Sequence, residues 1–154
     1  MQTELTPLAA VVDYHRAAPL FDDRPVPVNI LAQILDAGHM ALSGSSFEPG
    51  RFLLLHTPNR KAALRRAFGH AEVTNAPVVI AAIAEEPWLK GHVLQALAEL
   101  TLTAERVGYD TFTIQGFDPA AVRQELGLLG GSEVVGLVAI GRLLLPLQRN
   151  WRAS

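Results

Sequence analysis

The chain has 154 residues, a net charge of −2 at neutral pH and no cysteine. The length fits one domain, and the charge argues against a nucleic-acid partner, which requires a basic stripe of side chains. The lack of cysteine excludes disulfides, thiolate catalysis and cysteine-based zinc sites.

The composition is apolar for a small domain. Apolar residues make up 49% of the chain and charged residues 18%, against about 25% charged residues in an average soluble domain. Because a monomer of this length leaves much of its surface in water, the composition predicts an oligomer. The N-terminus lacks the features of a signal peptide, and the longest apolar run is too short to span a bilayer. We therefore expect a cytoplasmic protein without a membrane partner.

Two helices joined by an extended segment are expected first along the chain. Thr6 and Pro7 read as the N-cap and first residue of a helix that ends near Arg16. Three prolines keep residues 17–27 extended. Apolar residues at helical spacing then predict a helix over Val28–Leu42, which a serine-rich turn follows.

A short strand is expected over Phe52–His56, apolar enough to be buried. Asn59 is expected to cap the basic helix "RKAALRRAF". The four cations of this helix read as a solvated face, with an anion site at the edge of the helix as the alternative. The run "NAPVVIAAIA" gives the clearest strand of the sequence.

A long, mostly apolar helix is expected over Glu86–Val107, ended by Gly108. It is either the central helix of the domain or part of a dimer interface. Its polar residues form one stripe at spacings of three and four, made of His92, Gln95, Glu99, Thr103 and Arg106.

The remaining elements are short. A strand is expected over Thr111–Ile114, then a helix that Asp118-Pro119 begins and Gly127 ends, and a last strand over Glu133–Ile140. Residues 142–154 show no clear period and form a tail. Helices and strands alternate in one α+β domain, residues 1–154, with a small sheet flanked by helices. The strand order stays open.

Common catalytic and metal-binding patterns are missing. No two of the five histidines have the spacing of a metal site, and the serines at 43, 45 and 46 do not form a nucleophile elbow, which needs a strand before it and a helix after it. Neither a Rossmann fingerprint nor a phosphate-binding P-loop occurs. No single residue stands out as a general acid or base.

Five segments, in order, resemble the nitroreductase family. They are "HRAAPLFDDRPVPVNILAQILDAGHMA", the turn "ALSGSSFEPGRF", "NAPVVIAAIA", "RVGYDTFTIQGFDPAAVRQELGL" and "VVGLVAIGR". The resemblance covers nearly the whole chain. It implies a nitroreductase-like fold, an intertwined homodimer with FMN at the subunit interface, and a tail that reaches across the dimer. It also implies hydride transfer from NAD(P)H through the flavin to a small electron-poor acceptor, such as a nitroaromatic or quinone.

The resemblance also implies where FMN binds. The family's phosphate-binding arginines fall on His15 and Arg16, and its C-terminal basic residues fall near Arg149 and Arg152. The family's flavin-contacting turn falls on Ser43, Ser45, Ser46 and Glu48. The segment whose backbone N–H lies near flavin N5 falls on Gln115 and Gly116.

Several positions depart from the family pattern. Ala17 and Pro19 replace side chains that donate hydrogen bonds, Glu48 replaces a glutamine, and Gly50 replaces a tryptophan. An ionised carboxylate accepts hydrogen bonds but cannot donate them to the flavin carbonyls. The alternative function is therefore a nitroreductase-fold protein that has lost productive FMN chemistry and acts in ligand binding, flavin handling or protein interaction.

Overall fold

The computed structural model describes residues 21–43, 49–68, 76–114 and 116–144. A four-stranded sheet lies at its centre, with the strand order β1-β2-β4-β3 and every neighbouring pair antiparallel. The strands are β1 (Gly50–Leu55), β2 (Val78–Ala84), β3 (Asp110–Ile114) and β4 (Glu133–Gly141). β1 and β3 are therefore the two edge strands of this sheet.

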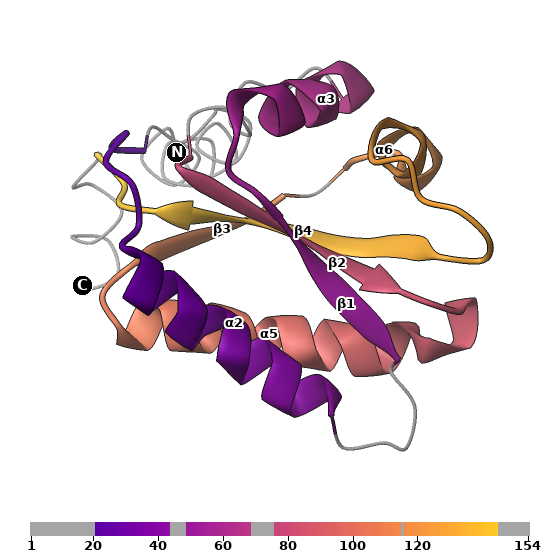
Figure 1. Cartoon of the computed structure of the whole chain (residues 1–154), viewed down its shortest axis with the longest axis horizontal. Helices are drawn as coiled ribbons and strands as arrows, with labels where there is room; N and C mark the ends of the chain where they lie inside the picture. Colours follow the sequence, from indigo (N-terminus) through magenta and orange to yellow (C-terminus); the bar gives the residue numbers. More distant parts are fainter. Residues whose placement is uncertain (1–20, 44–48, 69–75, 115, 145–154) are drawn as a thin grey trace, which may run out of the picture.

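Helices cover both faces of the sheet, so the domain has three layers (Figure 1). On one face lie α2 (Val28–Leu42) and α5 (Lys90–Arg106), which pack side by side. On the other face lie α3 (Pro58–Phe68) and α6 (Pro119–Glu125). This arrangement confirms the α+β prediction of a small sheet flanked by helices.

The position of β2 at the centre of the sheet accounts for its apolar sequence. All seven residues of "VVIAAIA" are buried, because successive side chains point to opposite faces and both faces are covered by helices. Its even-numbered residues pack with α2 and α5, and its odd-numbered residues pack with the α3 and α6 layer. A strand between two helical layers needs an unbroken apolar run, as predicted.

The edge strand β1 is less buried than the sequence predicted. It begins at Gly50 and ends at Leu55, and only these two residues are buried, while Arg51 is exposed. The expectation of a buried strand over Phe52–His56 was wrong on this point. The position of β1 at the sheet edge leaves one side of the strand uncovered by the described chain, and no apolar pattern reveals that position.

Two helix starts also differ from prediction. Pro58 is the first residue of α3, so Asn59 lies inside the helix. The Arg60 backbone N–H donates to the Thr57 hydroxyl oxygen at 3.4 Å, so Thr57 is the residue that caps the helix. The long helix begins at Lys90 and not at Glu86, because Pro87–Leu89 form a 3-10 turn (η1) before it.

The other described elements follow the predictions closely. α2 spans Val28–Leu42 as predicted, and the last two strands extend the predicted ones by a single residue each. Gly108 and Gly127 follow α5 and α6 with φ angles of +92° and +67°, which glycine adopts without strain. The predicted helix ending near Arg16 lies outside the described residues. Within the described part of the chain, no helix has the length and apolar character needed to cross a membrane.

Candidate functional site

Only two of the predicted cofactor-binding residues, Ser43 and Gly116, belong to the part of the chain that the structure describes. The others lie outside it: His15, Arg16, Ser45, Ser46, Glu48, Gln115, Arg149 and Arg152. The described residues that flank them nevertheless show from which points of the fold these segments leave.

Ser43 ends α2 as its C-cap. Its backbone N–H donates to the carbonyl oxygens of His39 at 3.0 Å and Met40 at 3.3 Å. Its hydroxyl donates to the same Met40 carbonyl at 2.9 Å, so this carbonyl at the helix end accepts two hydrogen bonds. The Ser43 hydroxyl proton is therefore used within the helix, and its oxygen lone pairs can accept a hydrogen bond from a ligand.

Gly116 lies two residues after β3 with a φ angle of +75°. A side chain is disfavoured there by backbone conformation and not by crowding, because a Cβ would meet no heavy atom within 4 Å. The residue is exposed. Its backbone is thus open to a close approach from outside the described chain.

Ser43 and Gly116 do not meet within one chain. The serine turn leads from α2 into Gly50, at the start of edge strand β1, whereas Gly116 follows β3 at the opposite edge. With β2 and β4 between them, the two edge strands lie about 14 Å apart, three spacings of about 4.8 Å.

Gly50 is held by close packing at the start of β1. A Cβ at this position would overlap the Ile83 carbonyl oxygen of β2 and lie 2.5 Å from Cγ2 of Val93 on α5. The Glu85 N–H also donates to the Pro49 carbonyl at 3.1 Å, which fixes the strand entry next to β2. No larger residue fits this backbone arrangement.

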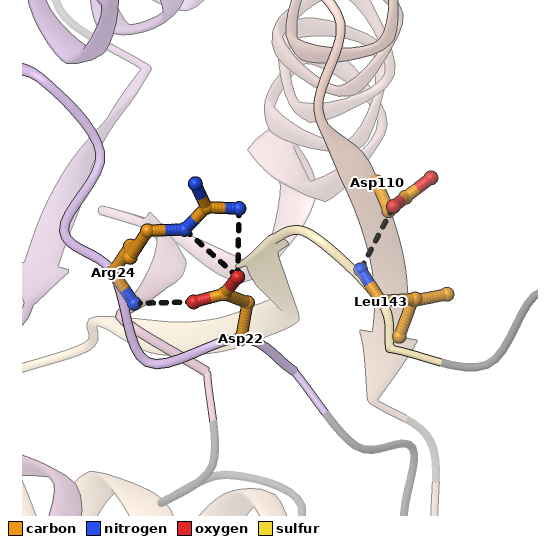
Figure 2. A network of polar contacts seen from close by, with 4 residues as sticks. All are labelled: Asp22, Arg24, Asp110 and Leu143. Carbon is orange, nitrogen blue, oxygen red and sulfur yellow. Dashed lines mark hydrogen bonds and ion pairs between the residues drawn. The ribbon is translucent and has the colours of Figure 1, made fainter.

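The two ends of the described chain lie side by side. Phe21 forms an isolated antiparallel bridge with Leu143, and the Asp22 N–H donates to the Arg142 carbonyl at 2.7 Å. On the other side, the Leu143 N–H donates to Oδ2 of Asp110 at 2.9 Å, as Figure 2 shows. We call these contacts of Phe21, Asp22, Asp110, Arg142 and Leu143 the terminal clasp. Sequence reasoning missed it, because local patterns do not reveal pairing between the two ends of a chain.

Charged side chains pair within the terminal clasp and next to it. Arg24 donates from Nε to Oδ2 of Asp22 at 2.8 Å and from its backbone N–H to Oδ1 at 2.9 Å (Figure 2). These hydrogen bonds from Arg24, with a smaller contribution from the charge of Arg142, hold the pKa of the Asp22 carboxyl below its ordinary value of 3.8. The guanidinium of Arg142 lies 4.6 Å from the centre of the Tyr109 ring, an attractive cation–π contact.

An open hollow of about 490 Å³ is lined by Asp118 and the start of α6, by Arg123 and by residues 130–134. Its charged groups serve local structure. Arg123 donates to the Gly130 carbonyl, Asp118 caps α6, and Glu133 lies 2.9 Å from the Lys90 ammonium. Within the described segments, no group of three or more His, Asp or Glu side chains gathers as a metal site. The terminal clasp is therefore the stronger functional candidate.

Comparison with known proteins identifies the family of this chain. The sequence pattern of the Nitroreductase family matches residues 67–142. A Thermus thermophilus protein named NADH dehydrogenase is 30% identical, with 76% of this chain and 77% of that protein covered. The chain belongs to the nitroreductase family.

Solved structures agree with this nitroreductase family fold. An oxidoreductase containing FMN is 25% identical with a TM-score of 0.72, covering 90% of this chain and 80% of that one. An FMN-dependent nitroreductase from Clostridium difficile R20291 is 21% identical with a TM-score of 0.68, covering 80% of each chain. A nitroreductase family protein from Clostridium difficile 630 is 20% identical with a TM-score of 0.73, covering 82% and 78%. They confirm the predicted nitroreductase-like fold.

Within this nitroreductase family member, the family pattern covers the sheet's inner strands, α5, α6 and the clasp residues Asp110 and Arg142. It does not extend to the serine turn or to Phe21. The matched stretch thus holds three of the four strands, whereas most of the residues expected to contact a cofactor lie outside it.

Proposed function

We propose that this protein is an FMN-dependent oxidoreductase that takes a hydride from NADH or NADPH and reduces a small electron-poor acceptor, such as a nitroaromatic or a quinone. Its family membership supports a flavin oxidoreductase. The names of the T. thermophilus relative and of the FMN-containing structures support the choice of reductant and cofactor. The flavin would supply the redox chemistry, and the protein would supply its binding and orientation.

One structural observation carries the cofactor proposal: Phe21 and Leu143 form a bridge. Arg16 lies five residues before Phe21, and Arg149 lies six residues after Leu143. Two segments with guanidinium groups therefore leave the fold at one point. A phosphate monoester is a dianion near neutral pH and is bound best by such planar, forked donors. We propose that Arg16, Arg149 and Arg152 bind the FMN phosphate, assisted by His15.

The ring of the flavin would be held by the serine turn and by backbone groups. Ser43, Ser45 and Ser46 would offer hydroxyl groups, and Glu48 would accept a hydrogen bond from the ring N3–H. At the other edge of the sheet, the backbone of Gln115 and Gly116 would approach flavin N5. The open space around Gly116 fits such an approach.

The distance between these two groups of residues favours a homodimer. Because Gly50 and Gly116 lie at opposite edges of one sheet, a second copy would have to bring its serine turn to Gly116. α5 provides a surface for this copy, since Leu94, Ala98 and Leu102 are exposed at four-residue spacing on one face of the helix. Burying this ridge would also account for the apolar composition.

The departures at the site keep a second function open. Ala17 and Pro19 lack the donor side chains found in the family, and Glu48 brings a negative charge to the turn. Gly50 fits only as glycine and leaves no tryptophan beside the ring position. These features favour a nitroreductase-fold protein that binds or transfers a flavin without catalysing its turnover.

The visible spectrum separates these functions. The purified protein should be yellow, or should quench the fluorescence of added FMN at micromolar concentrations, and NADH or NADPH should bleach the bound flavin. A protein that binds flavin but is not bleached by either nicotinamide would support the second function. A colourless protein that binds neither FMN nor riboflavin at tens of micromolar would contradict both flavin proposals.

The Arg16→Ala variant tests the phosphate assignment. Losing one charge-assisted hydrogen bond of about 1.5–3 kcal/mol should weaken FMN binding about 10- to 100-fold. Riboflavin, which has no phosphate, should bind nearly as before. Arg66→Ala is the control, because Arg66 lies on α3 and pairs with Glu125 at 3.3 Å. Equal losses for FMN and riboflavin would show that Arg16 is not a phosphate ligand.

A further inference from the structure

One end of the sheet collects the strand ends next to which the flavin ring is proposed to bind. The start of β1 lies beside the end of β2, where Gly50 pairs with Ala84. The end of β2 lies beside the start of β4, where Ala84 pairs with Glu133. Because β3 is antiparallel to β4, β3 also ends toward this side, two residues before Gly116. We call this end of the sheet, marked by Gly50, Ala84 and Glu133, the ring end.

The connection from β2 to α5 is short and is fixed at the ring end (Figure 1). It consists of residues 85–89, and the last three of them form η1. Glu85 donates its N–H to the Pro49 carbonyl at 3.1 Å, and its carboxylate lies 3.2 Å from Nε of Arg51. At the other side of the connection, Leu89 is buried. The backbone of this connection is therefore anchored both to β1 and to the core.

Trp88 is exposed on this anchored turn. It is 72% exposed, although tryptophan contributes more apolar area than most side chains when it packs in a core. A tryptophan on a fixed backbone loses little conformational freedom when a ligand stacks on it, since only two side-chain torsions become restricted. Tryptophans are for this reason enriched among the residues that contribute most to binding energy.

The basic side chains next to this indole are already paired. Arg51 pairs with Glu85, and the Lys90 ammonium lies 2.9 Å from Glu133. Glu86 adds a further carboxylate to the turn. This environment disfavours an anionic ligand and favours a neutral one. The face of an indole is rich in π-electron density, so it is complementary to a flat ring that is poor in electrons.

We propose that Trp88 binds the electron acceptor by stacking, and that it selects neutral, flat aromatic rings such as nitroaromatics and quinones. This inference rests on the proposed oxidoreductase function and adds the residue that recognises the acceptor. The position of η1 at the ring end supports it, because both segments expected to hold the flavin ring adjoin this end of the sheet. Trp88 acts by binding alone and exchanges no proton or electron with the acceptor.

Fluorescence tests the stacking without turnover. The chain has two tryptophans, so Trp151→Phe leaves Trp88 as the only one. In the absence of a nicotinamide, dinitrobenzene should quench the emission of this variant along a saturating curve, because a bound nitroaromatic lies in contact with the indole. Acrylamide, which quenches by collision, should give a linear curve. A linear curve for dinitrobenzene as well would overturn the inference.

Kinetics of the Trp88→Ala variant test the selectivity. The KM for dinitrobenzene should rise about tenfold, while kcat changes less than about twofold. Turnover of ferricyanide, an acceptor without a ring, and the affinity for FMN should both stay unchanged. Trp88→Phe should retain most of the affinity for dinitrobenzene, because a phenyl ring still stacks. Equal losses for dinitrobenzene and ferricyanide in Trp88→Ala would overturn the inference.

Val28→Ala is the matched control, since Val28 is an apolar residue at the start of α2 with 83% exposure. It should change neither the quenching nor the KM. Light scattering of Trp88→Ala excludes an indirect effect through assembly. A change of mass in this variant would assign Trp88 to a subunit interface and would overturn the inference.

The two proposals fail in different ways. If neither nicotinamide bleaches the flavin of the parent protein, the proposed oxidoreductase function is contradicted, and the quenching curve still decides whether Trp88 binds a ring. If the parent protein reduces dinitrobenzene and Trp88→Ala does so with the same KM, the flavin function stands and the role of Trp88 is overturned.

Discussion

Gly50 shows how one residue sets the start of an edge strand. It starts β1 against the Ile83 carbonyl and the Val93 side chain, where no Cβ fits. Without a side chain, this position brings β1, β2 and α5 into close contact at one end of the sheet.

The Gly50→Ala variant should lower the free energy of unfolding by at least about 2 kcal/mol, because overpacking against backbone atoms cannot be relieved by a rotamer change. A lower urea midpoint with an unchanged slope would report this loss. Gly91→Ala on α5 is the matched control, since a Cβ there would meet no atom within 4 Å. It should be neutral or stabilising by up to about 1 kcal/mol. Equal stability of the two variants would contradict the packing argument.

Single residues also mark the limits of sequence reasoning. Ser43 was predicted as a flavin contact, and the structure shows its hydroxyl proton donated to the Met40 carbonyl. Its role toward a ligand stays a prediction. Asn59 and Thr57 are both good capping residues, and the choice between them follows from Pro58, whose fixed φ suits the first position of the helix. A cap prediction that had weighed this proline would have chosen Thr57.

At the scale of elements, local signals predicted the structure well where they were complete. α6 is the clearest case: Asp118 accepts the Ala120 N–H at 3.1 Å, Pro119 is the first helical residue, and Gly127 ends the turn that follows. The long helix α5 was predicted too early in the chain, because Pro87 permits a 3-10 turn as readily as a helix start.

The cap of α6 can be tested directly. Asp118→Ala should lower the free energy of unfolding by about 1 kcal/mol, because it leaves the Ala120 N–H without its side-chain acceptor. Asp118→Asn should retain most of the stability, since an amide oxygen caps equally well. Thermal unfolding of the three proteins would measure the difference. A loss in Asp118→Asn as large as that in Asp118→Ala would assign the effect to charge and not to capping.

Strand order was the part of the fold that local patterns could not give. β2 and β4 were correctly expected as apolar strands, but nothing in "GRFLLL" indicates an edge position. Pairing between strands depends on contacts that are distant in sequence. For the same reason the terminal clasp, which joins Phe21 to Leu143, has no local signature.

At the scale of the whole molecule, the resemblance predicted the fold correctly, and the family comparison confirmed it. The predicted cofactor-binding residues stay a prediction, because all of them except Ser43 and Gly116 lie outside the described residues. In the sequence they fall between the expected helices and strands or near the chain ends, where neither hydrophobic period nor capping constrains the position of a side chain. The separation of the two sheet edges explains why the site cannot be assembled from Ser43 and Gly116 of one chain.

The proposed homodimer gives a prediction at this scale. The double variant Leu94→Arg with Leu102→Arg should convert a dimer into a monomer, because two charges would have to be buried in the interface. Both leucines are nearly half exposed in the single chain, at 47% and 46%. Leu129→Arg is the control, since Leu129 lies after α6 and is 83% exposed. Light scattering would measure the mass. A monomeric parent protein, or a dimeric double variant, would contradict this interface.

The bridge between Phe21 and Leu143 joins residues separated by almost the full length of the described chain. Closing so long a loop costs more chain entropy than forming the local turns and hairpins. We therefore expect this contact to form late in folding, once β3 and β4 have paired. A freshly synthesised or refolding molecule would then reach its compact core first and acquire the proposed phosphate site only at the final step.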